Sequence, residues 1–431
     1  MAEEKGSSAE LVRSFMVQET VLRVIGIWPT SSDSLASMAR WIFAMMTQIG
    51  TICSLSLEVY RHCVDINDTM DAFIMDLSSI VCLSKLFILR VNSKHTYALI
   101  NSILKDWSTV NDSRQELIMF EYFKRGRIVS LLILYLGYAS GFSFVVKALP
   151  LDVISPFQVR ESTIAIIRSF RSSSWRLKRE RSMFQMFRDS ANSSTNASNT
   201  FKLNYFLATY CVFGSLPLFH HICVLVFQGM QIFVNAVAHC ANDGLFFSLS
   251  MHLCGQFEVL KMNLAEIEFD KEIASRKKIE LLIKRHCTLA VLINDLEQSF
   301  NLIILVQLLM SALLICVEGF VFLVCLSIKD NVGALKSVVL MATLLIQLYL
   351  YAYAGDTLES RSEEIAQAAY DSPWYHARGH AAKDLVLIIN RGNLPYQVTA
   401  GKFVTMNILT FKEILKASAS YLSVLRVMMD T

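Results

Sequence analysis

The last apolar stretch of the sequence, Thr405–Arg426, reads "TMNILTFKEILKASASYLSVLR" and carries Lys412, Glu413 and Lys416 near its middle. On a helix, the polar residues of this stretch fall near one stripe: Thr405, Lys412, Lys416, Ser420 and Ser423. Several copies of such a helix around an axis can place the stripe on a water-filled lumen that apolar residues close. Alternatively, the charged part of the helix extends into the cytosol and never meets lipid. The two interpretations are compatible.

A further charge inside an apolar run is Glu318, within Leu302–Ile328. Carboxylates inside a membrane are costly and usually face protein or water. Glu318 therefore either faces an ion path or a ligand, or it ends a span near the outer interface.

The sequence offers few other groups for chemistry. His376 and His380 are four residues apart and could share a metal ion, but no third ligand is evident, so a solvated helix face is the stronger interpretation. Nucleophile-elbow, phosphate-loop and paired-carboxylate motifs are absent from the sequence. We predict neither an enzyme nor a cofactor, metal site or catalytic residue.

The composition indicates a membrane protein. The chain has 431 residues, 54% hydrophobic and 18% charged, and its mean hydropathy is +0.43, whereas a soluble domain has about 25% charged residues. The 10 cysteines are scattered without a C-x-x-C pair, which favours buried thiols over a zinc site or a disulfide framework.

Seven stretches provide the ~20 apolar residues that a membrane helix needs. They lie at Ala39–Leu57, Ala72–Leu89, Ile128–Leu149, Tyr205–Ala241, Leu302–Ile328, Ala334–Ala354 and Phe403–Met428. The fourth is longer than one span requires and contains Pro217, which predicts a kinked or overlong helix. We therefore predict an all-α membrane protein with seven transmembrane helices.

The positive charges predict the orientation. Lys and Arg are frequent in the second and fourth connections and rare in the first and fifth, which places the N-terminus in the cytosol and the C-terminus outside. The opening residues "MAEEKGSSAE" lack the apolar core of a secretory signal. The third connection conflicts, because its run Arg168–Arg188 is strongly basic. We interpret residues 160–205 as a disordered insert rather than as a patch for lipid headgroups or nucleic acid, and we predict no nucleic-acid partner.

These patterns divide the chain into six parts. Apolar residues recur at helical spacing between Asp243 and Phe300, and Glu280 and Lys284 form a favourable i,i+4 pair, so this connection is predicted to be helical. The predicted parts are a cytosolic segment at 1–38, helices 1–4 at 39–241, a cytosolic helical connection at 242–300, helices 5–6 at 301–354, a cytosolic helical anchor at 355–402, and the pore-lining helix 7 with the outer C-terminus at 403–431.

The C-terminal third resembles the insect odorant receptor family. The matching segments are "AAYDSPWY" (Ala368–Tyr375) and "INRGNLPYQVTAGKFVTMNILTFKEILKASASYLSVLR" (Ile389–Arg426). "DGLFFSLSMHLCGQFEVLK" (Asp243–Lys261) and "LLMSALLICVEGF" (Leu308–Phe320) resemble the family more moderately. The family usually has a shorter outer connection before the fourth span, so the region 160–205 is either a genuine insert or the product of an incorrectly joined exon.

The resemblance implies an odorant-specific subunit that binds small volatile apolar ligands and gates a nonselective cation channel. It implies a hetero-tetramer with an odorant co-receptor subunit in the plasma membrane, surrounded by membrane lipid. It places the outer gate at Val424, Val427 and Met428. Ligands in the family bind in the outer half of the bundle, and the candidate ligand-binding residues there are Phe73, Tyr138, Phe142, Tyr210, Phe213, Phe320 and Met341.

Other classes fit less well. A gustatory receptor relative is the close alternative, and the ending "SYLSVLR" favours the odorant branch. A secondary transporter would show internal repeats, and none is evident in the sequence. A G-protein-coupled receptor needs an outside N-terminus.

Overall fold

The computed structural model of the chain describes residues 18–29, 34–61, 66–110, 112–148, 205–214, 216–269, 272–376 and 380–430. The predicted insert at 160–205 lies outside the described residues, apart from Tyr205, and so do residues 1–17.

Helices make up nearly all of the regular structure. The described helices are α2 (Leu35–Arg61), α3 (Ile66–Val91), α4 (Ser93–Thr109), α5 (Ser113–Ala148), α8 (Tyr210–Phe213), α9 (Leu218–Ala265), α10 (Glu272–Ser327), α11 (Asn331–Asp371), the 3-10 turn η3 (Trp374–His376), α12 (His380–Gly392) and α13 (Ile408–Asp430). Within the described residues, six helices are long and apolar enough to cross a membrane: α2, α3, α5, α9, α10 and α11. Helix α13, with 23 residues and several charges, does not meet that criterion.

Local sequence explains where several helices begin. The side chain of Asp330 accepts a hydrogen bond from the Gly333 amide at 3.0 Å and caps α11. Asn407 does the same for the Thr410 amide at 3.0 Å and starts α13. Pro217 stands at the N-cap of α9, so the predicted kink within a long fourth helix is wrong: the proline precedes the helix, where its missing N–H costs no hydrogen bond.

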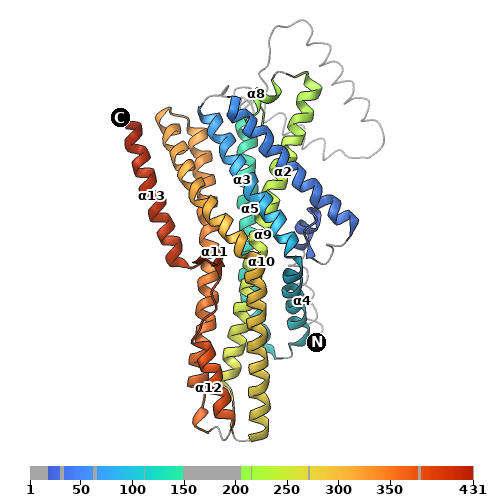
Figure 1. Ribbon diagram of the computed structural model, residues 1–431, viewed down its shortest axis with the longest axis vertical. Coiled ribbons are helices and arrows are strands. Elements are labelled where there is room, and N and C mark those ends of the chain that lie inside the picture. Colours follow the sequence, from blue (N-terminus) through green and yellow to red (C-terminus); the bar gives the residue numbers. More distant parts are fainter. Residues whose placement is uncertain are drawn as a thin grey trace, which may run out of the picture.

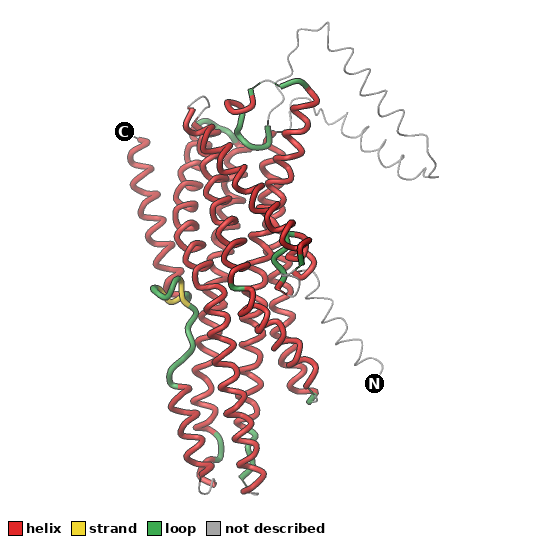
Figure 2. The backbone as a smooth tube through the Cα atoms, turned by 45° about the vertical axis from the view of Figure 1, so that its right-hand side comes forward, coloured by secondary structure: helices red, strands yellow, loops and turns green. Residues whose placement is uncertain are grey.

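The molecule is an elongated bundle that narrows toward one end. Helices α9, α10 and α11 run along most of its length, as Figures 1 and 2 show. At the broad end they pack with α2, α3 and α5, and α13 stands at the edge beside α10 and α11. At the narrow end they pack with α12, and α4 lies alongside. The predicted helical connection from Asp243 to Phe300 is confirmed, because α9 continues to Ala265 and α10 begins at Glu272.

Aromatic side chains fill the centre of the bundle. Phe246 of α9 lies with its ring centroid 5.3 Å from that of Phe300 of α10 and 4.9 Å from that of Tyr351 of α11. All three are almost completely buried. This cluster joins the three long helices α9, α10 and α11.

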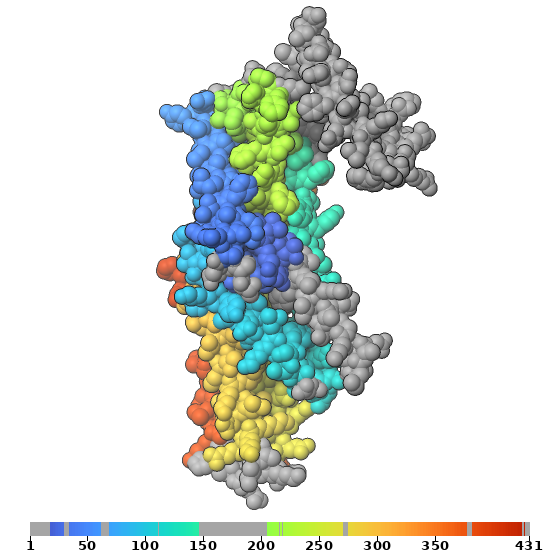
Figure 3. All heavy atoms as spheres, turned by 90° about the vertical axis from the view of Figure 1, so that its right-hand side faces the viewer, coloured from blue at the N-terminus to red at the C-terminus, as the bar shows by residue number. Residues whose placement is uncertain are grey.

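A buried carboxylate on α4 joins this helix to both α9 and α10. Asp106 contacts His252 Nε2 of α9 at 3.0 Å and Arg285 Nη2 of α10 at 2.7 Å. Burial alone would raise the pKa of Asp106, but the hydrogen bonds and charges of His252 and Arg285 outweigh it and lower this pKa below its ordinary value. Figure 3 shows the face that α2 and α4 cover, with the first part of α9 beside α2 and α10 below α4.

Candidate ligand cavity and pore helix

A cavity of about 100 Å³ lies inside the broad end of the bundle. Five helices line it, α3, α5, α9, α10 and α11, and most of the lining is apolar. The glycines of α5 let that helix approach α9 closely: a Cβ on Gly137 would lie 2.0 Å from Cys240 Sγ, and one on Gly141 3.2 Å from Ile232 Cγ2. The spacing of these two glycines, four residues apart, places both on the α9-facing side of α5.

The lining carries a connected polar group at one end. Ser78 Oγ of α3 donates a hydrogen bond to Asn235 Oδ1 of α9 at 3.1 Å. His239, one turn further along α9, has its Nε2 3.1 Å from the Ser78 carbonyl oxygen. These partners hold the polar side chains in fixed positions within an apolar wall.

A buried ion pair adjoins this polar end. Lys85 Nζ lies 2.5 Å from Asp243 Oδ1, and both side chains are almost fully buried. Tyr351 donates its hydroxyl to the same oxygen at 2.6 Å, and Lys85 Nζ lies 3.3 Å from His239 Nδ1. The pair therefore links α3, α9 and α11, and each charge has the partner that burial in a membrane protein demands.

The other end of the cavity is acidic. Gln307, Met310, Leu314 and Glu318 line the cavity from one face of α10, and their spacing extends it over roughly 16 Å of helix. Glu318 is 1% exposed. Its carboxylate oxygens have no hydrogen-bond partner among the described residues.

None of the seven residues predicted to bind ligand is among the residues that line the cavity. Tyr138 and Phe142 instead line an open groove on the outer side of the α5–α9 seam, where Tyr138 stacks on Phe233 with 6.1 Å between ring centroids. Phe73 is 37% exposed. Their role in ligand binding stays a prediction.

The remaining predicted ligand-binding residues are spread over two regions. Tyr210 and Phe213 form the short α8, and the ring of Phe213 lies 6.0 Å from that of Tyr205. Phe320 and Met341 are half-buried on α10 and α11. The cavity is lined instead by residues that the sequence reasoning missed on the same helices, such as Ile74, Gly141 and Leu340, and the Gly137/Gly141 spacing was the available signal.

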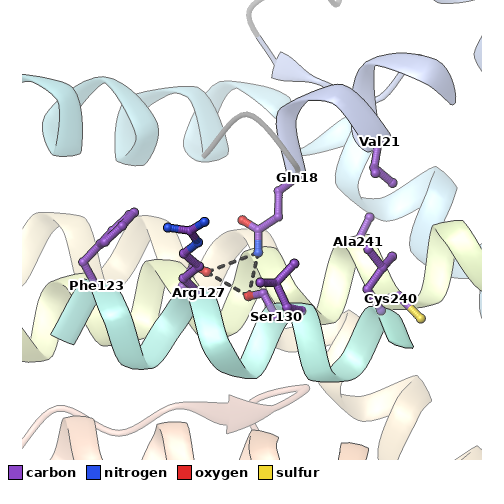
Figure 4. Close-up of a pocket in the computed structure, with 10 residues that line it drawn as sticks. Gln18, Val21, Phe123, Arg127, Ser130, Cys240 and Ala241 are labelled. Atoms are coloured by element: carbon purple, nitrogen blue, oxygen red, sulfur yellow. Dashed lines mark hydrogen bonds between the residues drawn. The ribbon is translucent and has the colours of Figure 1, made fainter. Parts of the chain in front are cut away.

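A second, smaller cavity of about 70 Å³ lies between the helical residues 18–24, α5 and α9. Figure 4 shows Gln18 reaching from the first of these toward Ser130 of α5, with Cys240 and Ala241 of α9 at the other end. Gln18 Nε2 donates hydrogen bonds to Ser130 Oγ at 2.7 Å and to Ser248 Oγ at 3.2 Å. Cys240 lines both cavities, so the α5–α9 seam separates them.

Helix α13 presents most of its length to the outside of the single chain. The side chains of Lys412, Lys416, Ser420 and Ser423, which form the predicted polar stripe with the half-buried Thr405, are exposed. The predicted gate residue Val424 is 59% exposed. Val427 and Met428 belong to α13, but their side chains lie outside the described residues.

A small β-hairpin joins the narrow end to α13. Strands β1 (Thr399–Ala400) and β2 (Val404–Thr405) pair antiparallel. The turn has positive φ at Gly401 (59°) and Lys402 (66°), conformations that L-residues adopt rarely. The hairpin is fixed to α10, because the Gly401 amide donates to the Asn301 carbonyl at 2.9 Å and Thr399 donates to the Glu297 carboxylate.

The hairpin also packs tightly on α11. Gly355 lies so close to it that an added Cβ would stand 2.0 Å from the Met406 carbonyl oxygen. Met406 in turn donates its amide to the Val398 carbonyl at 2.8 Å. The start of α13 is thus held directly by both α10 and α11.

The fold and site define an all-α, multi-pass membrane protein with a mainly apolar cavity between its helices. The sequence profile of the 7tm Odorant receptor family matches residues 65–419, and the chain belongs to this family. The seven-helix membrane fold is thereby confirmed, with α13 as the seventh helix, whereas its orientation stays a prediction.

Two curated relatives come from Drosophila melanogaster. Odorant receptor 47a is 26% identical over 190 residues, which cover 43% of this chain and 48% of that protein. Odorant receptor 13a is 28% identical over 204 residues, which likewise cover 43% of this chain and 48% of that protein. The matches thus span about half the length of these relatives.

Among solved structures, the fold is similar to the insect olfactory receptor OR5 from Machilis hrabei in complex with eugenol. The TM-score is 0.76 at 12% identity, over 98% of this chain and 99% of that one. The OR5 structure without a named ligand gives a TM-score of 0.75.

Proposed function

We propose that this chain is the odorant-specific subunit of a ligand-gated, nonselective cation channel. Small volatile apolar ligands bind in the cavity between α3, α5, α9, α10 and α11. The chain assembles with an odorant co-receptor subunit into a hetero-tetramer in the plasma membrane, with its N-terminus in the cytosol.

The observation that carries this proposal is the cavity itself. Its wall is mainly apolar, with a few polar groups that could orient a ligand, and this is the usual character of a small-molecule site. A protein of similar fold, OR5 from Machilis hrabei, has been solved in complex with eugenol.

The proposed pore rests on α13. In the single chain its polar stripe, which includes Lys412 and Lys416, is exposed. Four such helices around one axis would place this stripe on a shared lumen, with Val424, Val427 and Met428 as the apolar gate. The parts predicted as cytosolic, at 1–38, 242–300 and 355–402, then lie on the side of the N-terminus, and α13 ends on the outer side.

The first experiment is whole-cell recording from cells that co-express this chain with the co-receptor, during application of a broad panel of volatiles. We expect odour-evoked cation currents that are absent when this chain is omitted. Silence to the whole panel, with the protein shown to be at the cell surface, would contradict the proposal.

The place of ligand binding needs a separate comparison. Tyr138→Ala and Phe142→Ala alter the outer groove, whereas Met75→Ala and Leu314→Ala alter the cavity wall. The variants of the true site will change the rank order of active ligands. Variants elsewhere will change only the total current.

A further inference from the structure

We infer that Glu318 is a ligand-contacting residue that selects ligands with a hydrogen-bond donor, meaning small alcohols, phenols or amines. This inference rests on the proposed function, because it names the ligand class of the same cavity. It starts from the two carboxylate oxygens of Glu318, which are buried and have no hydrogen-bond partner among the described residues.

Such an unpartnered carboxylate is exceptional in a membrane protein. A buried acceptor without a donor loses its hydration and gains nothing in exchange. Elsewhere among the described residues buried charges have partners: Lys85 lies 2.5 Å from Asp243, and Glu58 accepts from two backbone amides at 2.8 and 2.9 Å. Glu318 lacks this compensation among the described residues, so the donor that completes the arrangement is something that these residues do not provide.

The neighbouring polar groups do not supply the donor. Lys336 of α11 is held by Asp71 of α3, with 2.6 Å between Nζ and Oδ1, and its ammonium also lies 4.2 Å from the ring centroid of Phe144. Ser337 is close to Glu318, yet no hydrogen bond of normal geometry joins the two.

The surroundings of Glu318 belong to the ligand cavity. Ile74, Phe144, Leu314 and Leu340 line the same cavity and provide an apolar wall. A ligand with an apolar body and a hydroxyl or amino group would lie against this wall and donate to Glu318. A donor ligand can bind in either protonation state, because at least one carboxyl oxygen still accepts, whereas only the ionised form, which has no O–H to donate, discriminates against acceptor-only ligands.

Acceptor-only ligands fit less well. An ether or a ketone cannot donate, so binding beside the ionised carboxylate would leave both oxygens of Glu318 desolvated and unpaired. Sites that hydrogen-bond a ligand group discriminate strongly against analogues that lack it. We therefore expect isomers that differ only in the donor to differ roughly tenfold or more in the concentration for half-maximal response.

The test uses isomeric pairs on the chain co-expressed with the co-receptor. Hexanol is compared with methyl pentyl ether, and 4-methylphenol with anisole, and shorter and longer alcohols are paired with their ethers. Hexylamine is the amine probe. We expect the donor isomer of each active pair to act at the lower concentration, and Glu318→Ala to bring the ratio close to one.

Two variants separate ligand contact from a structural role. Glu318→Gln keeps an acceptor of similar shape without the negative charge, so alcohol responses are retained while hexylamine responses fall if the amine binds as a cation. Glu280→Gln makes the same chemical change at an exposed position of α10 and should leave every ratio unchanged. Because the ratio is taken within one variant, lower expression does not alter it.

The outcomes distinguish the two proposals. Currents to the broad panel with equal potency for donor and ether isomers, or an unchanged ratio in Glu318→Ala, would overturn the role of Glu318 and leave the receptor function standing. That result would indicate that water satisfies the carboxylate. If the surface-expressed chain gives no current at all, thermal stabilisation of the purified chain by the same pairs decides the inference, and no stabilisation by any donor isomer overturns it.

Discussion

The contact between Gly355 of α11 and the hairpin before α13 gives the sharpest structural prediction. In Gly355→Ala the new Cβ would lie 2.0 Å from the Met406 carbonyl oxygen, whereas ordinary van der Waals contacts begin near 3.4 Å. The obstacle is backbone, so it cannot rotate away as a side chain could. Either the hairpin or α11 must move by more than about 1 Å.

The magnitude follows from three opposing effects. Overpacking a well-packed interior costs about 1–3 kcal/mol. Displacing Met406 also weakens its 2.8 Å hydrogen bond to Val398, at about 1 kcal/mol. Alanine is favoured over glycine inside a helix by about 1 kcal/mol. The helix gain offsets only the lost hydrogen bond, so we expect a net destabilisation of about 1–3 kcal/mol.

The assay is the apparent melting temperature of the detergent-solubilised protein, measured beside ligand-evoked current. Gly50→Ala is the matched control, because it is also a helical position and its nearest foreign atom, Gln231 Nε2, lies at 3.7 Å. We expect Gly355→Ala to lower the melting temperature and the current, whereas Gly50→Ala should leave the current unchanged and keep or raise the melting temperature, because alanine favours the helix. Wild-type stability and current in Gly355→Ala would refute the close packing that holds the start of α13.

Two further predictions concern the gate residues of α13 and the buried carboxylate of α4. Val424→Cys should make the current sensitive to a membrane-impermeant thiol reagent applied outside; insensitivity of V424C, V427C and M428C alike would remove the gate assignment. Asp106→Asn should lower stability by about 1.5–3 kcal/mol, because the hydrogen bond from Arg285 loses its charged acceptor. In the wild type, the lowered pKa of Asp106 means that this contribution is present above the ordinary aspartate pKa of about 4 and is lost as the pH falls through the lowered pKa. A melting temperature of D106N equal to that of wild type at pH 7 would contradict this.

The buried polar groups fall into two kinds. Lys85 and Asp243 pair with each other and join three helices, so their role is structural as the chain stands. Glu318 is as deeply buried, but its carboxylate has no hydrogen-bond partner within the described part of the chain, which is why it points to a ligand. From the sequence alone the possibilities for Glu318 stayed open, since the partners of a membrane carboxylate come from other helices.

Local signals in the sequence predicted the helices well. Long apolar runs, the helical spacing between Asp243 and Phe300 and the Glu280–Lys284 pair, now 2.7 Å apart, all depend on residues within a few turns of one another. Pro217 is the exception, because whether a proline kinks a helix or precedes it depends on where the helix starts. The C-terminal segments also identified the family from the sequence, because a resemblance depends on the order of residues and not on how the chain folds.

The tertiary structure decided which face of each helix meets the cavity. Tyr138 and Phe142 face the outer groove, while Gly141 between them lines both the groove and the cavity. In a membrane helix the side facing lipid and the side facing a hollow are both apolar, so hydrophobic periodicity does not separate them. The α5–α9 approach at Gly137 and the surroundings of Glu318 arise from segments far apart in the sequence. Sequence determined the helices and the family, and only packing between helices determined the site.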